Sequence, residues 1–335
     1  MKQGDVIHGY RILGKPTNTD AGKCLWTFAE KDGREFFIKE FLDPRRPRPN
    51  FMGSPEDRRA IEAQCDEFEL RHRSVNERID PKHLHAGNLV VPLDFFAEGS
   101  RYYKVTARVH PTDLREPQEL TPYGKRVLLG TLADSLWYLH SLRIVHGDLK
   151  PQNVLVHRPD GSDLHTAKLI DFDDAFPSGS PPDPMLIGGD PRYGAPEWVG
   201  YVRGEPEVGP EQLTIAADMF AFGLVAHTYL TGGPPGFDAR HGSPAEAVNA
   251  GERLVFDDRL DPELVEVLHA LADVRPTARP TIGHVQELLE HEEKLAFRRI
   301  TTESRRGTGR RSRVRINLDG RAPKAEFGRT GEKRK

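Results

Sequence analysis

Residues 146–153, which read HGDLKPQN, constrain the fold and chemistry of this chain more than any other feature of its sequence. They follow a run of leucines at helical spacing between residues 128 and 139, which predicts an amphipathic helix. An acid at Asp148, a cation at Lys150 and an amide at Asn153 then lie within six residues on one expected loop. Phosphoryl transfer needs a carboxylate near the attacking hydroxyl, a cation near the phosphate and a metal ligand close by. The segment therefore indicates a phosphoryl-transfer site.

The chain before this loop reads mainly as strands, with one helix among them. Strand-like runs occupy residues 10–13, 24–30, 35–41, 89–96 and 102–109. Asp32 and Gly33 are typical of a tight hairpin turn between the second and third of these runs. Apolar residues between positions 61 and 79 recur at spacings of four and three, which predicts a helix that Pro55 could start.

The second half reads mainly as helices. Two short strands are expected at residues 154–157 and 167–170, and helices at 213–230, 262–272 and 281–293. We find no internal repeat. Beyond residue 297 the chain is rich in Arg, Gly, Ser and Thr and poor in apolar residues, which predicts disorder.

The charge of the chain is unevenly distributed. The formal net charge is −3, but residues 294–335 hold 15 Lys and Arg against 4 Asp and Glu. An acidic body with a basic tail suggests two functional regions, and we expect the tail to contact polyanions or an acidic protein surface. The alternative is a tail that only increases solubility and binds no specific partner.

Two classes of protein are disfavoured by composition. The two cysteines, Cys24 and Cys65, are far apart, so neither a disulfide framework nor a zinc ribbon is expected. The start of the chain has no signal-peptide pattern, and no apolar run is long enough to span a bilayer. We therefore expect a cytoplasmic protein without a membrane anchor.

Six motifs in order resemble those of a known family. The segment at residues 146–153 is similar to the catalytic loop of eukaryotic-type protein kinases, and 171–173 (DFD) to their DFG motif. Residues 36–39 (FFIK) are similar to VAIK, and 195–197 match APE. Asp218 and Arg279 match two further family positions, and the resemblance covers roughly residues 10–293. The chain thus resembles a soluble, bacterial-like serine/threonine protein kinase.

This resemblance implies roles for the residues around Mg-ATP. Asp148 would be the base that orients the attacking hydroxyl, and Lys150 would neutralise the γ-phosphate. Asn153 and Asp171 would bind Mg²⁺, and Lys39 would hold the α- and β-phosphates. The implied cofactors are ATP and Mg²⁺, and the implied partner is a protein substrate.

The resemblance also places a nucleotide-binding shell around these groups. Glu69 is the preferred helix partner for Lys39, with Glu62 and Glu67 facing further away. In the nucleotide site, Gly14 and Gly22 would cover the phosphates, and Cys24 and Leu155 would enclose the adenine. Thr106 would be the gatekeeper residue, and Ala107 to Val109 would form the hinge.

The implied fold is α+β, with the two lobes of a protein kinase. Residues 1–109 would form a small lobe with an antiparallel sheet, residues 110–293 a larger and mainly helical lobe, and residues 294–335 the basic tail. Glu197, Asp218 and Arg279 would brace the platform that binds the protein substrate.

Four positions depart from the family pattern. Gly147 replaces the arginine that receives a phosphorylated activation loop. Asp173 replaces the glycine of DFG, and Asp190 replaces a threonine that usually braces the catalytic aspartate. Phe37 replaces a small alanine over the adenine and could narrow the nucleotide pocket. The glycine loop also lacks its central glycine.

Two alternative functions stay open at this point. A pseudokinase would bind nucleotide or act as a scaffold, which Phe37 and the atypical glycine loop favour. A small-molecule phosphotransferase would share the catalytic loop but need no brace between Glu197 and Arg279. The sequence does not name the substrate, the upstream signal or the oligomeric state.

Overall fold

The computed structural model describes residues 1–19 and 22–298 of the chain. The N-terminal part is built on a six-stranded antiparallel sheet in the order β1-β2-β3-β4-β6-β5. Its strands are β1 (Val6–Ile7), β2 (Tyr10–Ile12), β3 (Cys24–Lys31), β4 (Arg34–Phe41), β5 (Pro92–Glu98) and β6 (Arg101–Ala107). All five strand-like runs predicted before residue 110 are therefore found in the sheet, with boundaries shifted by up to three residues.

The hairpin between β3 and β4 sets the register of the site-bearing strands. Asp32 and Gly33 form its turn with φ angles of 53° and 72°, values that glycine and aspartate tolerate best. Because the turn has only two residues, Trp26 lies opposite Lys39, and Phe28 lies opposite Phe37. This register decides which side chains of β3 accompany the lysine.

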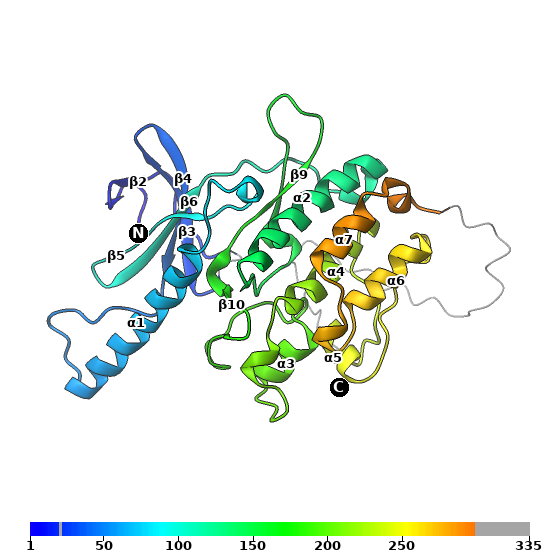
Figure 1. Ribbon diagram of the computed structural model, residues 1–335. Coiled ribbons are helices and arrows are strands. Elements are labelled where there is room, and N and C mark those ends of the chain that lie inside the picture. The colour runs from blue at the N-terminus through cyan, green and yellow to red at the C-terminus, as the bar shows by residue number, and fades with distance from the viewer. Residues whose placement is uncertain (20–21, 299–335) are drawn as a thin grey trace, which may run out of the picture. The chain divides into compact units, whose positions relative to one another are not determined.

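Helix α1 (Pro55–Asn76) covers part of the sheet (Figure 1). Ser54 and Asp57 form a capping box at its start, each side chain accepting from the backbone of the other. Its apolar stripe is buried as predicted and packs through Cys65 and Phe68 on Phe41 of β4. The helix thus lies directly behind the strand that carries Lys39.

The C-terminal part is mainly helical. Its helices are α2 (Pro122–Ser141), α3 (Pro196–Val202), α4 (Ala216–Thr231), α5 (Pro244–Asn249), α6 (Pro262–Leu271) and α7 (Ile282–Leu289). Two small antiparallel pairs lie between α2 and α3: β7 (Ile144–Val145) with β10 (Phe176–Pro177), and β8 (Val154–His157) with β9 (Thr166–Leu169). This matches the α+β architecture expected from the sequence.

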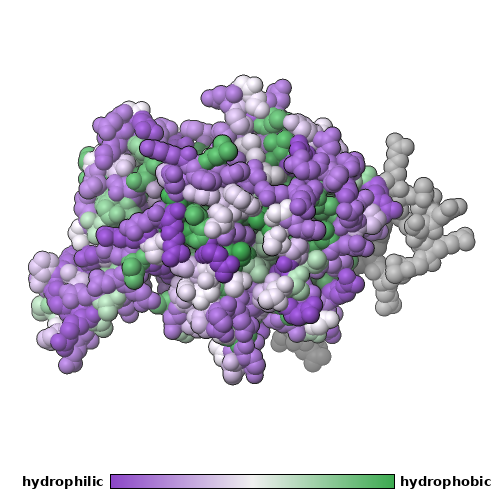
Figure 2. Space-filling model, viewed as in Figure 1, coloured by the Kyte–Doolittle hydropathy of each residue, from purple (hydrophilic) through white to green (hydrophobic). Residues whose placement is uncertain are grey.

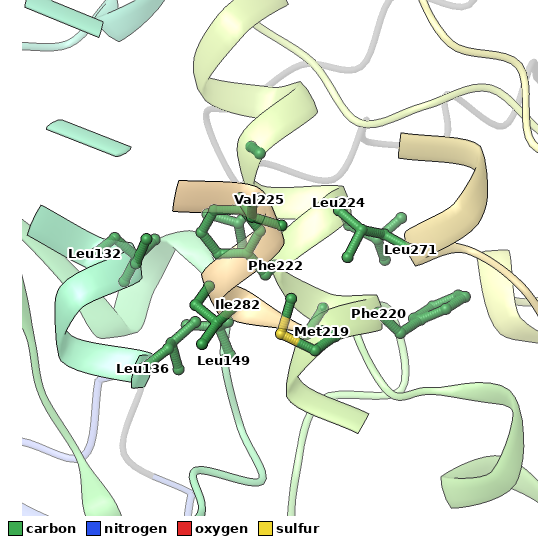
Figure 3. Close-up of a cluster of buried hydrophobic side chains, with 14 of the residues drawn as sticks. Leu132, Leu136, Leu149, Met219, Phe220, Phe222, Leu224, Val225, Leu271 and Ile282 are labelled. Carbon is green, nitrogen blue, oxygen red and sulfur yellow. The ribbon is translucent and has the colours of Figure 1, made fainter. Parts of the chain in front are cut away.

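The core of this part lies between α2, α4, α6 and α7 (Figure 3). The predicted leucine stripe of α2 is buried, with Leu132 and Leu136 both 0% exposed. They face α4, which is buried on nearly every side and contributes Phe222 and Leu224. Leu149, in the loop at 146–153, joins the same core and anchors that loop to it.

The folded unit extends beyond the predicted boundary at residue 293. A short 3₁₀ helix, Glu292–Leu295, places Leu295 in the core with no exposed surface. Phe297 lies against the cations of Lys125 and Arg259, and the backbone N–H of Arg298 donates to Arg259 at 2.7 Å. The compact unit therefore ends at Arg298, five residues later than predicted, because apolar side chains after 293 still pack.

This boundary predicts the outcome of truncation. Removing the chain after Arg298 should leave the unfolding temperature of the folded unit unchanged. Removing it after Glu293 should lower stability by about 2–3 kcal/mol, because full burial of one leucine contributes about that much. Thermal and urea unfolding of the two truncated proteins beside the full chain measures the difference. Equal stability of all three proteins would contradict this packing.

The molecular surface on the face shown in Figure 2 is mostly hydrophilic, with apolar residues in small separated groups. Within the described residues, no helix combines the length and apolar character needed to cross a bilayer. The basic tail from residue 299 onward lies outside the described residues, so its predicted disorder and polyanion binding stay predictions.

Candidate functional site

The loop at residues 146–153 is fixed by hydrogen bonds to one buried carboxylate. Asp218 of α4 accepts the backbone N–H groups of His146 at 2.8 Å and Gly147 at 3.1 Å. Its third contact is the ring of His140, 3.0 Å away. Because Asp218 is 2% exposed, these charge-assisted bonds are shielded from water and fix the loop firmly. Asp218 therefore braces the loop at residues 146–153, as its family position implied.

Glycine at position 147 is required by the backbone. Gly147 has a φ of 79°, in the left-handed region, and an added Cβ would lie 2.4 Å from the carbonyl oxygen of Asp174. No side chain fits there without moving the segment after the DFD motif. The arginine expected from the family pattern is thus excluded by the close approach of Asp174.

Asp148 is held by three groups in the same region. Its carboxylate accepts from the Asn153 amide at 2.8 Å and from the backbone N–H of Asp190 at 2.9 Å, and it pairs with Lys150 at 2.6 Å. Asp148 is 9% exposed, so its carboxylate is fixed in position yet still borders two cavities. The three catalytic residues predicted from the loop are therefore brought together.

Asp190 takes the place of the expected threonine and acts through its backbone. While its N–H binds Asp148, its carboxylate binds the guanidinium of Arg192 at 2.7 and 3.0 Å. Burial raises the pKa of the Asp190 carboxyl, but the hydrogen bonds and charge of Arg192 outweigh it and lower that pKa. Neutralised in this way, Asp190 adds little negative charge beside Asp148.

Asp171 follows β9 and lines the same cavity as Asp148. Its φ of 64° is left-handed, a conformation that aspartate adopts more readily than most residues. Its two carboxylate oxygens each lie 2.9 Å from the Lys39 ammonium. Asp171, Lys39, Lys150 and Asn153 line two neighbouring cavities, which therefore share one polar wall.

The groups near Asp171 fit a hard divalent cation. The amide nitrogen of Asn153 is used on Asp148, which leaves the amide oxygen without a hydrogen bond among the described residues. A carboxylate and an amide oxygen are ligands that Mg²⁺ prefers. No cluster of three or more His, Cys, Asp or Glu side chains that could hold a metal is found in residues 1–19 and 22–298. A metal here would need further ligands from water or from a substrate.

Lys39 is buried, and Glu69 is not its partner. Lys39 is 6% exposed and bonds to Asp173 at 2.6 Å as well as to Asp171. Burial alone would lower the pKa of Lys39, but the two aspartates outweigh it and hold that pKa above its usual range. The expected pairing with Glu69 is wrong in this structure, because that carboxylate binds Arg46 and the hydroxyl of Tyr102.

Lys104 is a site residue that sequence reasoning missed. It lies on β6 directly opposite Lys39, is 3% exposed, and bonds to the carboxylate of Asp173. Burial would raise the pKa of the Asp173 carboxyl, but Lys104 and Lys39 hold it well below its usual range. The available signals were a lysine between Tyr103 and Val105 in the strand run and an aspartate where the family has glycine.

A cavity of about 570 Å³ lies against this polar wall. Its lining includes the expected adenine-site residues Thr106, Ala107, Val109 and Leu155. This size falls within the range usual for small-molecule sites. Phe37 also lines the cavity, with its ring stacked on Trp26 at 5.4 Å, so a phenyl group here does not close it.

Cys24 is not in this cavity. It is 9% exposed, packs with Phe41 and Phe68 under α1, and borders the neighbouring cavity of about 460 Å³. Trp26 and Phe28 occupy the place over the cavity that was assigned to Cys24. The error is one of register, because the two-residue hairpin places Trp26 opposite Lys39 and Cys24 opposite Phe41, two positions further along β4.

The two predicted glycines of the phosphate-covering loop are described, but residues 20–21 between them are not. An added Cβ on Gly14 would lie 3.0 Å from the Thr27 hydroxyl, a tight approach that favours glycine. Gly22 has a φ of 53° and borders the smaller cavity rather than the one with Thr106. The backbone of Thr17 pairs with Trp26, so this loop folds back over β3.

The brace between Glu197 and Arg279 is formed as expected. The guanidinium binds both carboxylate oxygens at 2.7 Å, and the two side chains are 3% and 0% exposed. The same guanidinium donates to the backbone carbonyls of Ala216 and Asp273. This bidentate pair ties the start of α3 to α4 and to the loop before α7.

His72 makes the fold sensitive to acid. It is 4% exposed, lies among Phe41, Phe68 and Phe95, and its Nε2 has no partner among the described residues. Burial lowers the pKa of His72 to about 3, although Asp173 opposes the shift and Lys104, Arg71 and Lys39 add to it. The folded protein therefore holds this ring neutral.

The lowered pKa predicts a loss of stability below pH 6.5. In the unfolded chain the ring takes up a proton near pH 6.5, whereas the folded protein resists it until about pH 3. The stability contributed by the neutral ring is complete above pH 6.5 and falls by up to about 1.4 kcal/mol per pH unit below it. His72→Phe should remove this dependence. Urea unfolding between pH 7.5 and 5, with the exposed His110→Phe as control, measures it, and parallel curves for His72→Phe and wild type would contradict it.

Comparison with known families supports one assignment. The family described as "Protein kinase domain" matches residues 60–292, more than half of the chain. The match begins inside α1, so strands β1–β4, with Lys39, precede it. The observed sheet nevertheless supplies these strands, and their hairpin carries the lysine into the shared polar wall.

Curated relatives of modest sequence identity are also protein kinases. MAP kinase-activated protein kinase 2 of Oryctolagus cuniculus is 25% identical over 299 residues, covering 84% of this chain and 72% of the relative. Serine/threonine-protein kinase PkaA of Streptomyces coelicolor is 34% identical over 172 residues, covering 50% of this chain and 29% of the relative. Death-associated protein kinase dapk-1 of Caenorhabditis elegans is 30% identical over 186 residues, covering 53% of this chain and 11% of the relative. The expected two-lobed fold is confirmed, and the chain belongs to the protein kinase family of the eukaryotic type.

Proposed function

We propose that this chain is an active protein kinase that transfers the γ-phosphate of Mg-ATP to serine or threonine hydroxyls of a protein. The observation that carries the proposal is the fixed carboxylate of Asp148, bound by Asn153, Lys150 and the backbone of Asp190. It stands beside the polar wall of Lys39 and Asp171, as phosphoryl transfer requires. A scaffold protein would need no such alignment.

Each group has a task that follows from its place. Asp148 would accept the hydrogen bond of the attacking hydroxyl and orient it toward the phosphate. Lys150 and Lys39 would offset the negative charge of the phosphates. Asp171 and the free amide oxygen of Asn153 would hold Mg²⁺, which when bound neutralises charge on the phosphate oxygens. The apolar lining around Thr106 and Leu155 would receive the adenine.

A protein substrate is favoured over a small molecule. The buried pair of Glu197 and Arg279 stabilises the segment that follows Asp190, directly after the catalytic groups. A small-molecule phosphotransferase has no need of a braced surface at this place. The relatives named above are called protein kinases, which supports the same substrate class for this chain.

Two measurements on the full chain test the proposal. Thermal unfolding with and without Mg-ATP reports nucleotide binding, and transfer from γ-labelled ATP to the chain itself or to mixed protein acceptors reports catalysis. We expect stabilisation and labelling together, with the label on serine or threonine after acid hydrolysis. Stabilisation without labelling would identify a pseudokinase. Label on tyrosine alone would overturn the hydroxyl preference.

A further inference from the structure

Two buried lysines face each other across the sheet at the catalytic site. Lys39 on β4 and Lys104 on β6 are directly opposite in the register, and their side chains are 7% and 4% exposed. Like charges at directly opposite positions repel, and burial removes the water that would screen them. Such a pair needs a permanent carboxylate between its members.

Asp173 supplies that carboxylate. One of its oxygens bonds to Lys39 at 2.6 Å and the other bonds to Lys104, so each lysine has its own oxygen. Its side chain is 15% exposed, which leaves little room for water to compete. The short 3₁₀ turn Phe172–Asp174 fixes the backbone there and points this residue back toward β4 and β6.

Asp171 cannot perform this task during the reaction. It also contacts both lysines, at 2.9 Å and 3.4 Å, but it is the carboxylate assigned to Mg²⁺ in the proposed function. Once it turns to the metal, Asp173 alone would remain to balance the two ammonium groups. Glu69 of α1 is committed to Arg46 and Tyr102, so the helix offers no substitute from that position.

We infer that Asp173 is the residue that positions Lys39 for the phosphates of ATP, with Lys104 as its counter-charge, in place of a glutamate from helix α1. This inference rests on the proposed function for the identity of the ligand. Its physical consequence is that Lys39 and Asp171 keep their places through a contact inside the DFD segment. The ionic link from the sheet to α1 is not needed.

The test compares the affinities of Mg-ATP and adenosine in variants of the full chain. Asp173→Asn leaves two lysines to compete for Asp171, so Mg-ATP should bind at least about tenfold more weakly, equivalent to about 1.4 kcal/mol. Adenosine should bind within about twofold of wild type, because it lacks the phosphates that Lys39 would contact. Asp160→Asn, in the exposed loop after β8, is the control for the loss of one negative charge.

Charge compensation separates positioning from a general structural effect. The double variant Asp173→Asn/Lys104→Met removes the repulsion between the two opposed lysines. Its Mg-ATP affinity should therefore recover at least about threefold relative to Asp173→Asn. Should Asp173→Asn fail to fold, the double variant beside Lys104→Met decides: weaker Mg-ATP binding in the double variant supports the inference, and equal binding overturns it.

Three other results overturn the inference. They are wild-type Mg-ATP affinity in Asp173→Asn, an equal loss of adenosine affinity, and a loss that appears in Glu69→Gln instead. Each can occur in a chain that still transfers phosphate, so the proposed function would survive. A wild-type chain that binds Mg-ATP but transfers nothing contradicts the proposed function alone, whereas one that binds no nucleotide contradicts both.

Discussion

Asp171→Asn should abolish the magnesium dependence of ATP binding and reduce phosphoryl transfer at least about 100-fold, because a metal that neutralises phosphate charge is worth several kcal/mol. The substitution removes a carboxylate that lines both neighbouring cavities together with Asn153 and Lys39. An asparagine keeps the size of the side chain but not its charge, so the left-handed backbone at this position is preserved.

Calorimetric titration of ATP with and without Mg²⁺ measures this effect. The wild-type chain should bind ATP more tightly with the metal, and Asp171→Asn should bind equally in both conditions. Adenosine affinity should not change, because the apolar lining of the cavity is untouched. Unchanged magnesium dependence in the variant would show that the metal is held elsewhere.

Arg279→Leu should destabilise the helical part by about 3–5 kcal/mol, the usual cost of leaving one member of a buried ion pair alone. Glu197 would then keep a buried charge without its bidentate partner. The double variant Glu197→Leu/Arg279→Leu should lose less than the single variant, because removing both charges leaves no uncompensated ion.

Urea unfolding of both variants measures the difference, with Arg126→Ala as a matched control. Arg126 pairs with Glu290, but their side chains are 32% and 68% exposed, so its loss should cost less than about 1 kcal/mol. A double variant that is less stable than Arg279→Leu would contradict this account of the brace.

The catalytic loop could be predicted from the sequence because its geometry is local. Asp148, Lys150 and Asn153 are separated by only a few residues, so any loop that positions one of them positions the others. The hydrogen bonds of Asn153 and Lys150 to Asp148 follow from that short spacing. The longer strands and helices were also predictable, since apolar patterns with periods of two and about 3.6 residues report which face is buried. The short helices α3 and α5 and the short strands β1, β7 and β10 were not predicted.

The partners of Lys39 could not be predicted, because they depend on contacts across long distances in the sequence. Lys104 and Asp173 are 69 residues apart, and nothing in either segment alone indicates a pair. Glu69 lies on the predicted helix, but side-chain direction decides that it meets Arg46 and Tyr102. Comparison with the family motif predicts a helix glutamate as the partner of Lys39. It cannot show that in this chain the partner carboxylate belongs to Asp173.

The assignment of Cys24 failed for a different reason. The family pattern alone does not fix the length of the turn between β3 and β4. The observed hairpin has a turn of two residues and brings Trp26, not Cys24, opposite the lysine. A slip of two keeps the same face of the strand but changes which side chain covers the cavity. A two-residue turn at Asp32-Gly33 is enough to predict the observed register, with Trp26 opposite Lys39.

Asp148 is the residue on which the proposed phosphoryl transfer depends most directly. At saturating Mg-ATP, initial transfer of labelled γ-phosphate to a protein acceptor should be readily measurable for the wild-type chain and about 10²–10⁴-fold slower for Asp148→Asn, the usual range for losing a general base. ATP affinity should stay within about twofold in the same preparations, because Asp148 acts on the hydroxyl. Equal transfer rates for the two proteins, or no transfer by the wild-type chain, would contradict the assignment of this site as a protein kinase active site.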